Sequence, residues 1–460
     1  MTRCVAAPQY RGANRAPPDP PVWRRCARRD DHARMIDAPD RSFLTRLFEA
    51  AVAAGDPGAA VQRNLPEAPA GRTVVVGAGK AAARMAAALE GVWPAPLTGV
   101  VAVPYSHGAP CRSVRVIEAA HPVPDAAGLT AARALIAAVR GLGDDDLVIA
   151  LISGGGSALL PAPPAGLTLA DEAALTEALL SSGAPIQVLN AIRRRTSRIK
   201  GGRLAAMAHP TRVVSLIVSD VPGDDPAEIA SGPTVPAATG APADAVALAR
   251  DHAIALPARI RAHLDAAGDD APRPGDPAFA RDSVHVVASA GRSLEAAARA
   301  AREGDVPAAI LSEAITGEAR EAGHLHGAIA AEIARRHRPL IPPVVLLSGG
   351  EVTVTGAPAG ATGGPNTEFL LAAALTIAGA GRITALAADT DGTDGAAGAA
   401  GAIADADTAG HLRAAGLDPA ALLRGHDSAR AFAAIEGLVA SGPTGTNVND
   451  FRAFLIRPRE

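Results

Sequence analysis

Residues 73–89 read TVVVGAGKAAARMAAAL, and this stretch decides the class of fold. Thr73–Val76 is β-branched throughout and predicts a strand, whereas the alanine-rich run that begins at Lys80 is typical of a helix. A second strand, Asp146–Ile152, is almost entirely apolar and runs directly into Ser-Gly-Gly-Gly-Ser at 153–157. Strands that are apolar at successive positions are buried on both faces, as in parallel sheets covered by helices. The sequence therefore predicts an α/β protein.

The same alternation extends outward along the chain. It predicts further strands at 99–103, 113–117, 213–218, 284–288 and 308–311, with helices at 40–54, 126–140, 169–181, 243–250 and 293–302. The predicted architecture is a doubly wound, Rossmann-like sheet with helices on both faces, an α/β/α domain.

A basic and then proline-rich run at 335–343 predicts a linker. Beyond it a smaller α/β/α block is predicted, with strands at 344–347, 382–388 and 450–456 and helices at 368–377 and 404–415. We expect a disordered extension at 1–34, a large domain at 35–335 and a small one at 340–460. We expect the active site in the interdomain cleft.

The first 34 residues carry eight arginines against three aspartates. The alternatives are a disordered extension, with Met35 as the working initiator, and a transit peptide. Five prolines in the segment would break the amphipathic helix of a transit peptide, so the extension is favoured.

Composition excludes several classes of function. A net charge of −3, two Trp, two Tyr and seven Phe provide no basic, aromatic surface for nucleic acid. The apolar runs have strand length, so no membrane span is expected. Three cysteines without a CxxC pair argue against disulfides or zinc and favour a cytoplasmic location. The expected partner is a small molecule, bound by a monomer or homodimer.

Two glycine-rich loops follow predicted strands and suit an anionic ligand. Gly77 and Gly79 lie where the first strand meets its helix, beside Lys80, one of only two lysines in the chain. The loop lacks the P-loop spacing because position 74 is Val, and it matches the weak dinucleotide pattern GxGxxA. The interval from Glu90 to Glu118 contains no acidic residue to hold a ribose, which disfavours NAD. The alternative for Lys80 is a solvated helix lysine.

The second loop can present successive backbone N–H groups and hydroxyls to an anion; its residues are Ser153, Gly154, Gly155, Gly156 and Ser157. The alternative is a flexible turn. Residues 190–203 are strongly basic, and helical spacing places Asn190, Arg193 and Ser197 on one face. Together with Lys200 they are predicted to bind an anionic substrate, against the alternative of a solvated basic helix.

Carboxylates also follow strands. Asp220 ends the predicted strand 213–218 and suits a base or a metal ligand. A turn after the strand 382–388 supplies a predicted Mg²⁺ site, against the alternative of Asx-turn chemistry; its carboxylates are Asp389, Asp391 and Asp394. Polar residues near the other glycine-rich turns of the small domain are predicted to face the nucleotide or the cleft: Glu351, Asn366, Glu368, Thr444 and Asn447. His121, which is followed by Pro122 and Pro124, is interpreted as a turn residue.

Nine stretches in order resemble the class II glycerate 2-kinase family, whose C-terminal part is called the MOFRL domain. They are VVVGAGKAA (74–82), EAAHPVPD (118–125), ALISGGGSALLPAP (150–163), SRIKGGRLA (197–205), VSDVPGDDPAEIASGPT (218–234), LLSGGEVTVTG (346–356), GGPNTEF (363–369), ADTDGTDG (388–395) and SGPTGTNVND (441–450).

The resemblance implies ATP-dependent, Mg²⁺-assisted phosphorylation of D-glycerate at its 2-hydroxyl, giving 2-phospho-D-glycerate, with Lys80 as the important catalytic residue. Because many members of the family bear the name hydroxypyruvate reductase, an NAD(P)H-dependent enzyme of that kind is the alternative. The family often has arginine where this chain has Pro365, so the role of that arginine does not carry over. Arg193 and Arg198 are the candidates to replace it.

Physical reasoning gives these residues roles in phosphoryl transfer, which needs positioning and positive charge. Lys80 is expected on the transferring phosphoryl group, and the 153–157 loop on an anionic end of substrate or nucleotide. Asn190 and Arg193 are expected on the glycerate carboxylate, and Asp220 as the base or a metal ligand.

Overall fold

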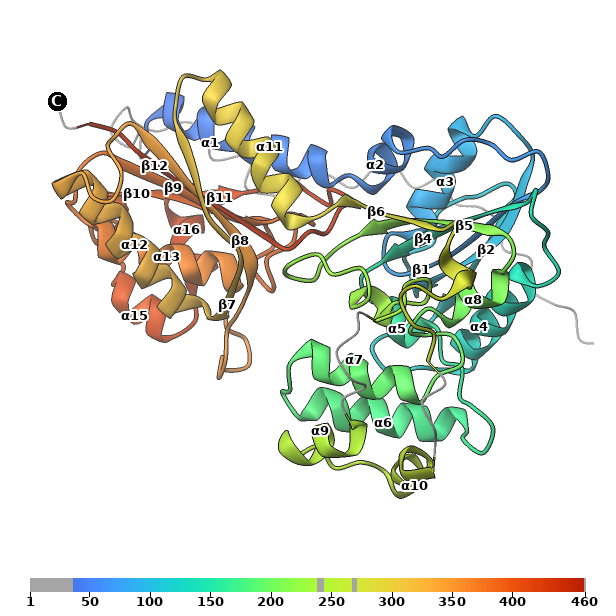
Figure 1. The fold of residues 1–460 in the computed structure, drawn as a ribbon. Helices are drawn as coiled ribbons and strands as arrows, with labels where there is room; N and C mark the ends of the chain where they lie inside the picture. The colour runs from blue at the N-terminus through green and yellow to red at the C-terminus, as the bar shows by residue number, and fades with distance from the viewer. Residues whose placement is uncertain (1–35, 238–243, 267–270, 459–460) are drawn as a thin grey trace, which may run out of the picture. The chain divides into compact units, whose positions relative to one another are not determined.

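The computed structural model describes residues 36–237, 244–266 and 271–458, so the predicted extension at 1–34 lies outside the described residues. Two six-stranded sheets organise the described chain (Figure 1). Their strand orders are β3-β2-β1-β4-β5-β6 and β11-β10-β9-β12-β8-β7. The predicted α/β class with two sheets is confirmed.

Every neighbouring pair in the first sheet is parallel. Its strands are β1 (Thr73–Ala78), β2 (Leu97–Pro104), β3 (Val114–Ala119), β4 (Leu147–Ser153), β5 (Arg212–Val218) and β6 (Ser283–Ala288). Helices α2 (Pro57–Arg63) and α3 (Ala82–Val92) cover one face, and α4 (Ala126–Val139), α5 (Gly156–Leu159) and α8 (Arg203–Ala208) cover the other.

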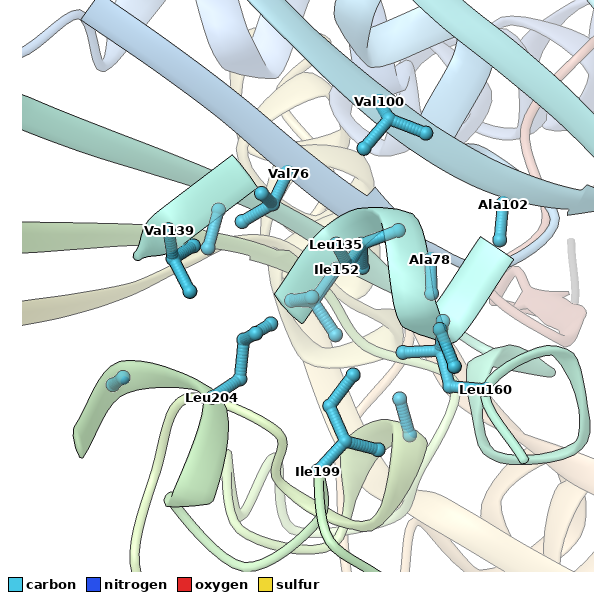
Figure 2. Close-up of a cluster of buried hydrophobic side chains, with 14 of the residues drawn as sticks. Val76, Ala78, Val100, Ala102, Leu135, Val139, Ile152, Leu160, Ile199 and Leu204 are labelled. Atoms are coloured by element: carbon cyan, nitrogen blue, oxygen red, sulfur yellow. The ribbon is translucent and has the colours of Figure 1, made fainter. Parts of the chain in front are cut away.

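Alternate residues of β1 point into two different cores. Val76 and Ala78 pack with Leu135 of α4 and Leu204 of α8, as Figure 2 shows, whereas Val75 packs among residues of α2 and α3. Burial on both faces explains why this strand is apolar at every position after Thr73. It also makes the carboxyl edge of the sheet the place where polar groups can meet.

A small helical layer is attached to the first sheet through the segment that follows β4 (Figure 1). It consists of α6 (Leu169–Ser181), α7 (Ile186–Arg195), α9 (Ala245–Asp251) and α10 (Ala258–Ala266). These helices share their own apolar cluster, which includes Leu175, Leu179 and Ile192. The helix α7, which carries Asn190 and Arg193, is therefore held by an apolar cluster separate from the two cores of the first sheet.

The second sheet is mixed. Its strands are β7 (Ala308–Glu318), β8 (Val344–Thr353), β9 (Ile383–Asp389), β10 (Gly401–Asp405), β11 (Leu438–Val439) and β12 (Asp450–Ile456). β12 is antiparallel to both β8 and β9, and β7 is parallel to β8. Its helices include α12 (Ala319–Arg336), α13 (Pro365–Ile377), α14 (Thr408–Ala414), α15 (Pro419–Arg424) and α16 (Ser428–Ala434).

Two local expectations are corrected. The strand expected at 308–311 among those of the large domain is part of β7 and pairs with β8 of the second sheet. The glycine-rich stretch 348–351, expected as a turn, lies within β8. Gly350 adopts φ +109°, and a Cβ there would lie 2.2 Å from the Ile315 carbonyl oxygen. These glycines allow β7 and β8 to approach each other closely.

The helix predicted at 40–54 is α1 (Ala38–Gly55), and it packs on the second sheet. Its Phe43, Leu47 and Phe48 join an apolar cluster with Leu294 of α11 (Ala290–Glu303) and Phe451 of β12. Segments from before and after the first sheet thus complete the second. Among the described residues, none of the helices combines the length and apolarity needed to cross a bilayer.

Candidate active site

The adjacent ends of β1, β4 and β5 bring Lys80, Gly154 and Asp220 together. The Lys80 amide donates to the Gly154 carbonyl at 2.9 Å. A Cβ built on Gly154 would lie 1.7 Å from Asp220 Oδ2, so a side chain at 154 would collide with that carboxylate. Ligands of open parallel sheets bind at the carboxyl ends of strands, where these residues lie. The structure thus places the two predicted catalytic residues on one edge.

Gly77, Gly79 and Ser153 have packing roles at the turn after β1. A Cβ on Gly77 would meet the Leu151 carbonyl at 2.4 Å, and Gly79 has φ +126° with Ser153 directly against it. Ser153 Oγ, which is buried, accepts the Ala81 amide at 3.0 Å. The amides of Lys80 and Ala81 are therefore bonded within the protein. The expectation that a phosphate binds them is wrong for this turn.

The amides at the start of α5 are differently placed. Within the described residues, the N–H groups of Gly155 and Gly156 make no hydrogen bond to the protein. Gly155 adopts φ +80°, which a residue with a side chain rarely does. This part of the 153–157 loop keeps the donor character that the sequence predicts.

Asn190 and Arg193 form a network with the 153–157 loop. Ser157 Oγ lies 2.8 Å from Ser231 Oγ, which donates to Asn190 Oδ1 at 2.8 Å. Arg193 donates to the same oxygen at 3.3 Å, and Asn190 Nδ2 donates to Glu228. The side-chain amide of Asn190 is therefore buried and fully bonded to protein groups. The expectation that Asn190 contacts a ligand is corrected: this side chain holds Arg193 in place. Ser197, predicted on the same face, is also buried, and its Oγ accepts the Ile199 amide.

Lys200 is not available to a substrate. Its Nζ forms an ion pair with Glu172 at 3.0 Å and donates to the Leu160 carbonyl at 3.1 Å, and the residue is 2% exposed. The prediction that Lys200 binds phosphate is corrected, because Glu172 of α6 neutralises it inside the protein. Lys80, by contrast, is exposed.

The second sheet contributes to the surroundings of Asp220. Asn449 Nδ2 donates to the Asp220 carbonyl at 3.0 Å. Burial raises the pKa of the Asp220 carboxyl, and the nearby Lys80 ammonium partly offsets this rise. Burial, Asp450 and Asp220 all raise the pKa of Glu351, and Lys80 again opposes them. Lys80 and Asp220, at the edge of the first sheet, therefore both influence the carboxyl of Glu351, which comes from the second sheet.

The three carboxylates predicted as a Mg²⁺ site have separate tasks. Asp394 is buried and accepts the amides of Asn366 and Thr367, both at 2.8 Å, at the start of α13. Asp389 accepts the Asp391 amide at 2.8 Å, and burial next to other carboxylates raises the pKa of Asp389 to about 8. In the described ranges, no three His, Cys, Asp or Glu side chains are arranged to hold a metal. The Asx-turn alternative describes these residues better.

Two further small-domain residues are buried and bonded to protein. Asn366 Nδ2 donates to Asp450 at 2.6 Å. Glu368 pairs with Arg320 at 2.8 Å and with His426 at 2.9 Å. The expectation that these side chains face a nucleotide is corrected, because both act within the second domain. Glu351 alone of this predicted set is exposed and next to Asp220.

Thr444 and Asn447 order the loop that carries Asn449. The Thr444 amide donates to the Asp391 carbonyl at 3.1 Å, and its hydroxyl donates to the Thr390 carbonyl. Asn447 Oδ1 accepts the Asn449 amide at 3.2 Å. Through this loop they position the residue that contacts Asp220.

The two candidates to replace the absent family arginine at Pro365 differ in position. Arg198 lines a groove with Leu129 and Pro161 to Pro164. Arg193 lies near His121, whose pKa its charge lowers, and burial lowers the pKa of Arg193 itself. Of these two arginines, Arg193 is the one that lies near His121 and therefore near Lys80.

His121, which the sequence predicts only as a turn residue, lies beside Lys80 and the 153–157 loop. A Cβ on Gly155 would lie 3.2 Å from His121 Nε2 and 3.5 Å from Lys80 Cγ, so the imidazole and the lysine flank the same glycine. Its position two residues beyond the end of β3 is the signal that could have revealed it, because the other site residues also follow strand ends.

Comparisons with known proteins cover most of the chain. Residues 43–265 match the family described as a domain of unknown function, DUF4147, and residues 344–450 match the MOFRL family. A glycerate 2-kinase from Pyrococcus horikoshii is 38% identical, over 82% of this chain and 86% of that protein. A protein from Agrobacterium vitis with the provisional name hydroxypyruvate reductase is 50% identical, over 93% of this chain and 97% of its own length.

The crystal structure of glycerate kinase from Thermotoga maritima superposes with a TM-score of 0.82 at 35% identity, over 91% of this chain and all of that one. Fold, domain pair and relatives agree with the resemblance found in the sequence. The chain belongs to the class II glycerate 2-kinase family, built from a DUF4147 and a MOFRL domain.

Proposed function

We propose that this protein transfers the γ-phosphoryl group of ATP to the 2-hydroxyl of D-glycerate, giving 2-phospho-D-glycerate and ADP. The observation that carries the proposal is the neighbourhood of Lys80. An exposed ammonium, the unbonded amides of Gly155 and Gly156, and Arg193 supply positive charge beside Asp220. Phosphoryl transfer depends mainly on such charge and on alignment. Family membership supports the same reaction.

The proposed roles divide the substrates between the two sides of Gly155. Lys80 contacts the transferring phosphoryl group, and Arg193 contacts the glycerate carboxylate. Arg193 suits this task because Asn190 holds one of its nitrogens and leaves the rest of the guanidinium able to form a paired contact. The amides of Gly155 and Gly156 stabilise negative charge between the two cations.

We propose Asp220 and Glu351 as the ligands of Mg²⁺. Mg²⁺ in kinases is usually held by one or two carboxylates together with substrate phosphates, so a site with two carboxylates fits it. Burial, Asp450 and Asp220 raise the pKa of Glu351, and a cation bound between Glu351 and Asp220 would relieve the repulsion between these two carboxylates. Mg²⁺, when bound, neutralises charge on the phosphates. Asp220 and Glu351 orient it through hard oxygen ligands.

The alternative, a nicotinamide-dependent hydroxypyruvate reductase, corresponds to the name of some relatives. Two features count against it. The amides at the start of α3, which would hold a dinucleotide pyrophosphate, are bonded to Ser153 and Gly154. The carboxylate of Glu118, beside the loop after β2, already accepts the Gly108 amide at 3.0 Å.

The choice between monomer and homodimer remains a prediction. The domain limits 35–335 and 340–460 are also untested, and the packing of the elements supports a different boundary. Because α11, β7 and α1 pack with the second sheet, we propose that the boundary between the two domains falls near Ser289.

Purified protein incubated with D-glycerate, ATP and Mg²⁺ is expected to form ADP. Adding enolase should convert the product directly to phosphoenolpyruvate, which identifies 2-phosphoglycerate and not its 3-isomer. Hydroxypyruvate with NADH or NADPH is the parallel reaction. Nicotinamide oxidation without ADP formation would favour the reductase and contradict the proposal.

A further inference from the structure

His121 lies against the 153–157 loop, and its imidazole has no hydrogen-bond partner among the described residues. It follows β3, whereas Gly155 follows β4 and Lys80 follows β1, so three strand ends contribute to one small region. Its Nε2 would lie 3.2 Å from a Cβ on Gly155. Within the described residues, no hydrogen bond or ion pair ties the imidazole to the protein. An unbonded ring nitrogen in this position is free to meet a substrate.

Three positively charged or titratable side chains surround His121 and determine its protonation state. Lys80 from the turn after β1, His107 from the loop after β2 and Arg193 from α7 all lower its pKa, after the larger effect of partial burial. The imidazole is therefore neutral at neutral pH and has a lone pair available on one nitrogen. Because Lys80 and Arg193 are both close enough to lower the pKa of His121, a molecule that contacts both cations places its central atoms near this ring.

Resting on the proposed function, we propose that His121 is the catalytic base that accepts the proton of the glycerate 2-hydroxyl. In glycerate the 2-hydroxyl is bonded to the carbon next to the carboxylate. With the carboxylate on Arg193 and the phosphoryl group on Lys80, this hydroxyl lies between the two cations, beside His121.

The step balances as follows. The hydroxyl proton passes to an imidazole nitrogen while the hydroxyl oxygen forms a bond to the γ-phosphorus. The bond between that phosphorus and the β–γ bridging oxygen breaks, and its electron pair leaves with ADP. The imidazolium then releases its proton to solvent, which reaches the exposed side of the residue. Asp220 is thereby left to act as a cation ligand, which settles the two roles that the sequence left open for it.

The test compares wild type with His121→Asn, and with His107→Asn as the matched control. His107 is a nearby exposed histidine whose Nδ1 lies 3.1 Å from the Tyr105 carbonyl, outside the proposed machinery. The specificity constant kcat/KM for D-glycerate is measured from pH 5 to 9 at saturating ATP and Mg²⁺. Wild type and the control should lose activity below an apparent pKa under 6.5, whereas His121→Asn should be about 100-fold slower or worse and lack this acid limb.

A second variant separates proton acceptance from a structural role. His121→Gly should regain activity when imidazole is added, and substituted imidazoles should restore it in the order of their basicity. Unchanged melting temperature and KM for ATP would show that the fold and the nucleotide site are intact. If wild type is active but His121→Asn keeps the acid limb, or imidazole has no effect, the assignment of His121 is overturned. Wild type that is inactive with glycerate and ATP would instead contradict the proposed function.

Discussion

The side-chain amide of Asn449 donates a 3.0 Å hydrogen bond to the backbone carbonyl of Asp220, joining residues 229 positions apart in the sequence. It attaches the loop before β12 to the end of β5, next to Lys80 and Gly154. Both sheets therefore position the proposed cation ligand.

Replacing Asn449 with Ala should lower kcat about tenfold, because Asp220 loses its contact with the second sheet. The free energy of unfolding should fall by only about 1 kcal/mol, the usual worth of one hydrogen bond. Steady-state rates and urea denaturation measure the two effects. Asn447→Ala removes only a contact that orders the Asn449 backbone and leaves the Asn449 side chain in place, so it should affect kcat less. Equal kcat in Asn449→Ala and wild type would contradict a positioning role.

Lys80→Met should lower kcat by 100-fold or more in roughly the range known for the loss of one charge-stabilising donor. Lys80→Arg keeps the charge and should retain more activity than Lys80→Met. Coupled measurement of ADP formation gives both rates. A kcat for Lys80→Met within about threefold of wild type, about 0.65 kcal/mol of barrier, would remove Lys80 from the mechanism.

Gly154→Ala should abolish most activity, because its Cβ would occupy the space of the Asp220 carboxylate. Gly143→Ala is the matched control, since a Cβ at 143 meets no atom within 4 Å. The affinity for Mg²⁺, measured as its activation constant, should weaken in the first variant and stay unchanged in the second. An unaltered constant in Gly154→Ala would argue against Asp220 as a metal ligand.

Lys200→Met should destabilise the protein by about 3–5 kcal/mol, because the buried Glu172 carboxylate would lose its partner. Adding Glu172→Leu removes the stranded charge and should restore much of the loss. Chemical denaturation of the single and double variants gives the comparison. If Lys200→Met instead changes only the KM for a substrate, the ion pair has been misread.

Stability should fall below pH 6.5 in part through His326. Burial lowers the pKa of His326 to about 4, while its Nε2 lies 3.0 Å from Ser348 Oγ. The unfolded chain therefore binds a proton near pH 6.5 that the folded protein does not, so this stability is complete above pH 6.5 and is lost toward pH 4. The loss attributable to this group is up to about 3 kcal/mol.

His326→Gln should flatten the dependence of the free energy of unfolding on pH between 6.5 and 4, relative to wild type. Denaturant titrations at several pH values measure the difference, which cancels the contributions of other groups. Parallel curves for the two proteins would show that His326 is charged in both states or in neither.

The features that could be predicted from the sequence are those determined by residues close together in the chain. The strand-to-glycine transitions at 73–80 and 147–157 could be recognised because burial on both faces and tight turns restrict the residue types allowed there. Lys80 and Asp220 each follow a predicted strand, and the carboxyl ends of parallel strands share one edge of a sheet. Their positions at one edge therefore follow from the predicted parallel topology.

Long-range partners could not be predicted in this way. Helical spacing identified Lys200 as a cation, but nothing near it in sequence indicates that Glu172 of another helix neutralises it. Likewise, a strand such as β7 does not specify which sheet it joins, because that choice depends on packing with β8 and α11. The two prolines that follow His121 predict only a turn, so the local sequence does not reveal its position beside Gly155.

The position of α1 has a consequence for biosynthesis. Asp40 at its start accepts a 2.7 Å hydrogen bond from Arg457, 417 residues later. During translation this helix is made long before the elements that cover its apolar face, which are first α11 and then, near the end of the described chain, β12. The nascent chain therefore exposes this apolar segment at least until α11 has been made, which makes α1 a site where chaperones can bind.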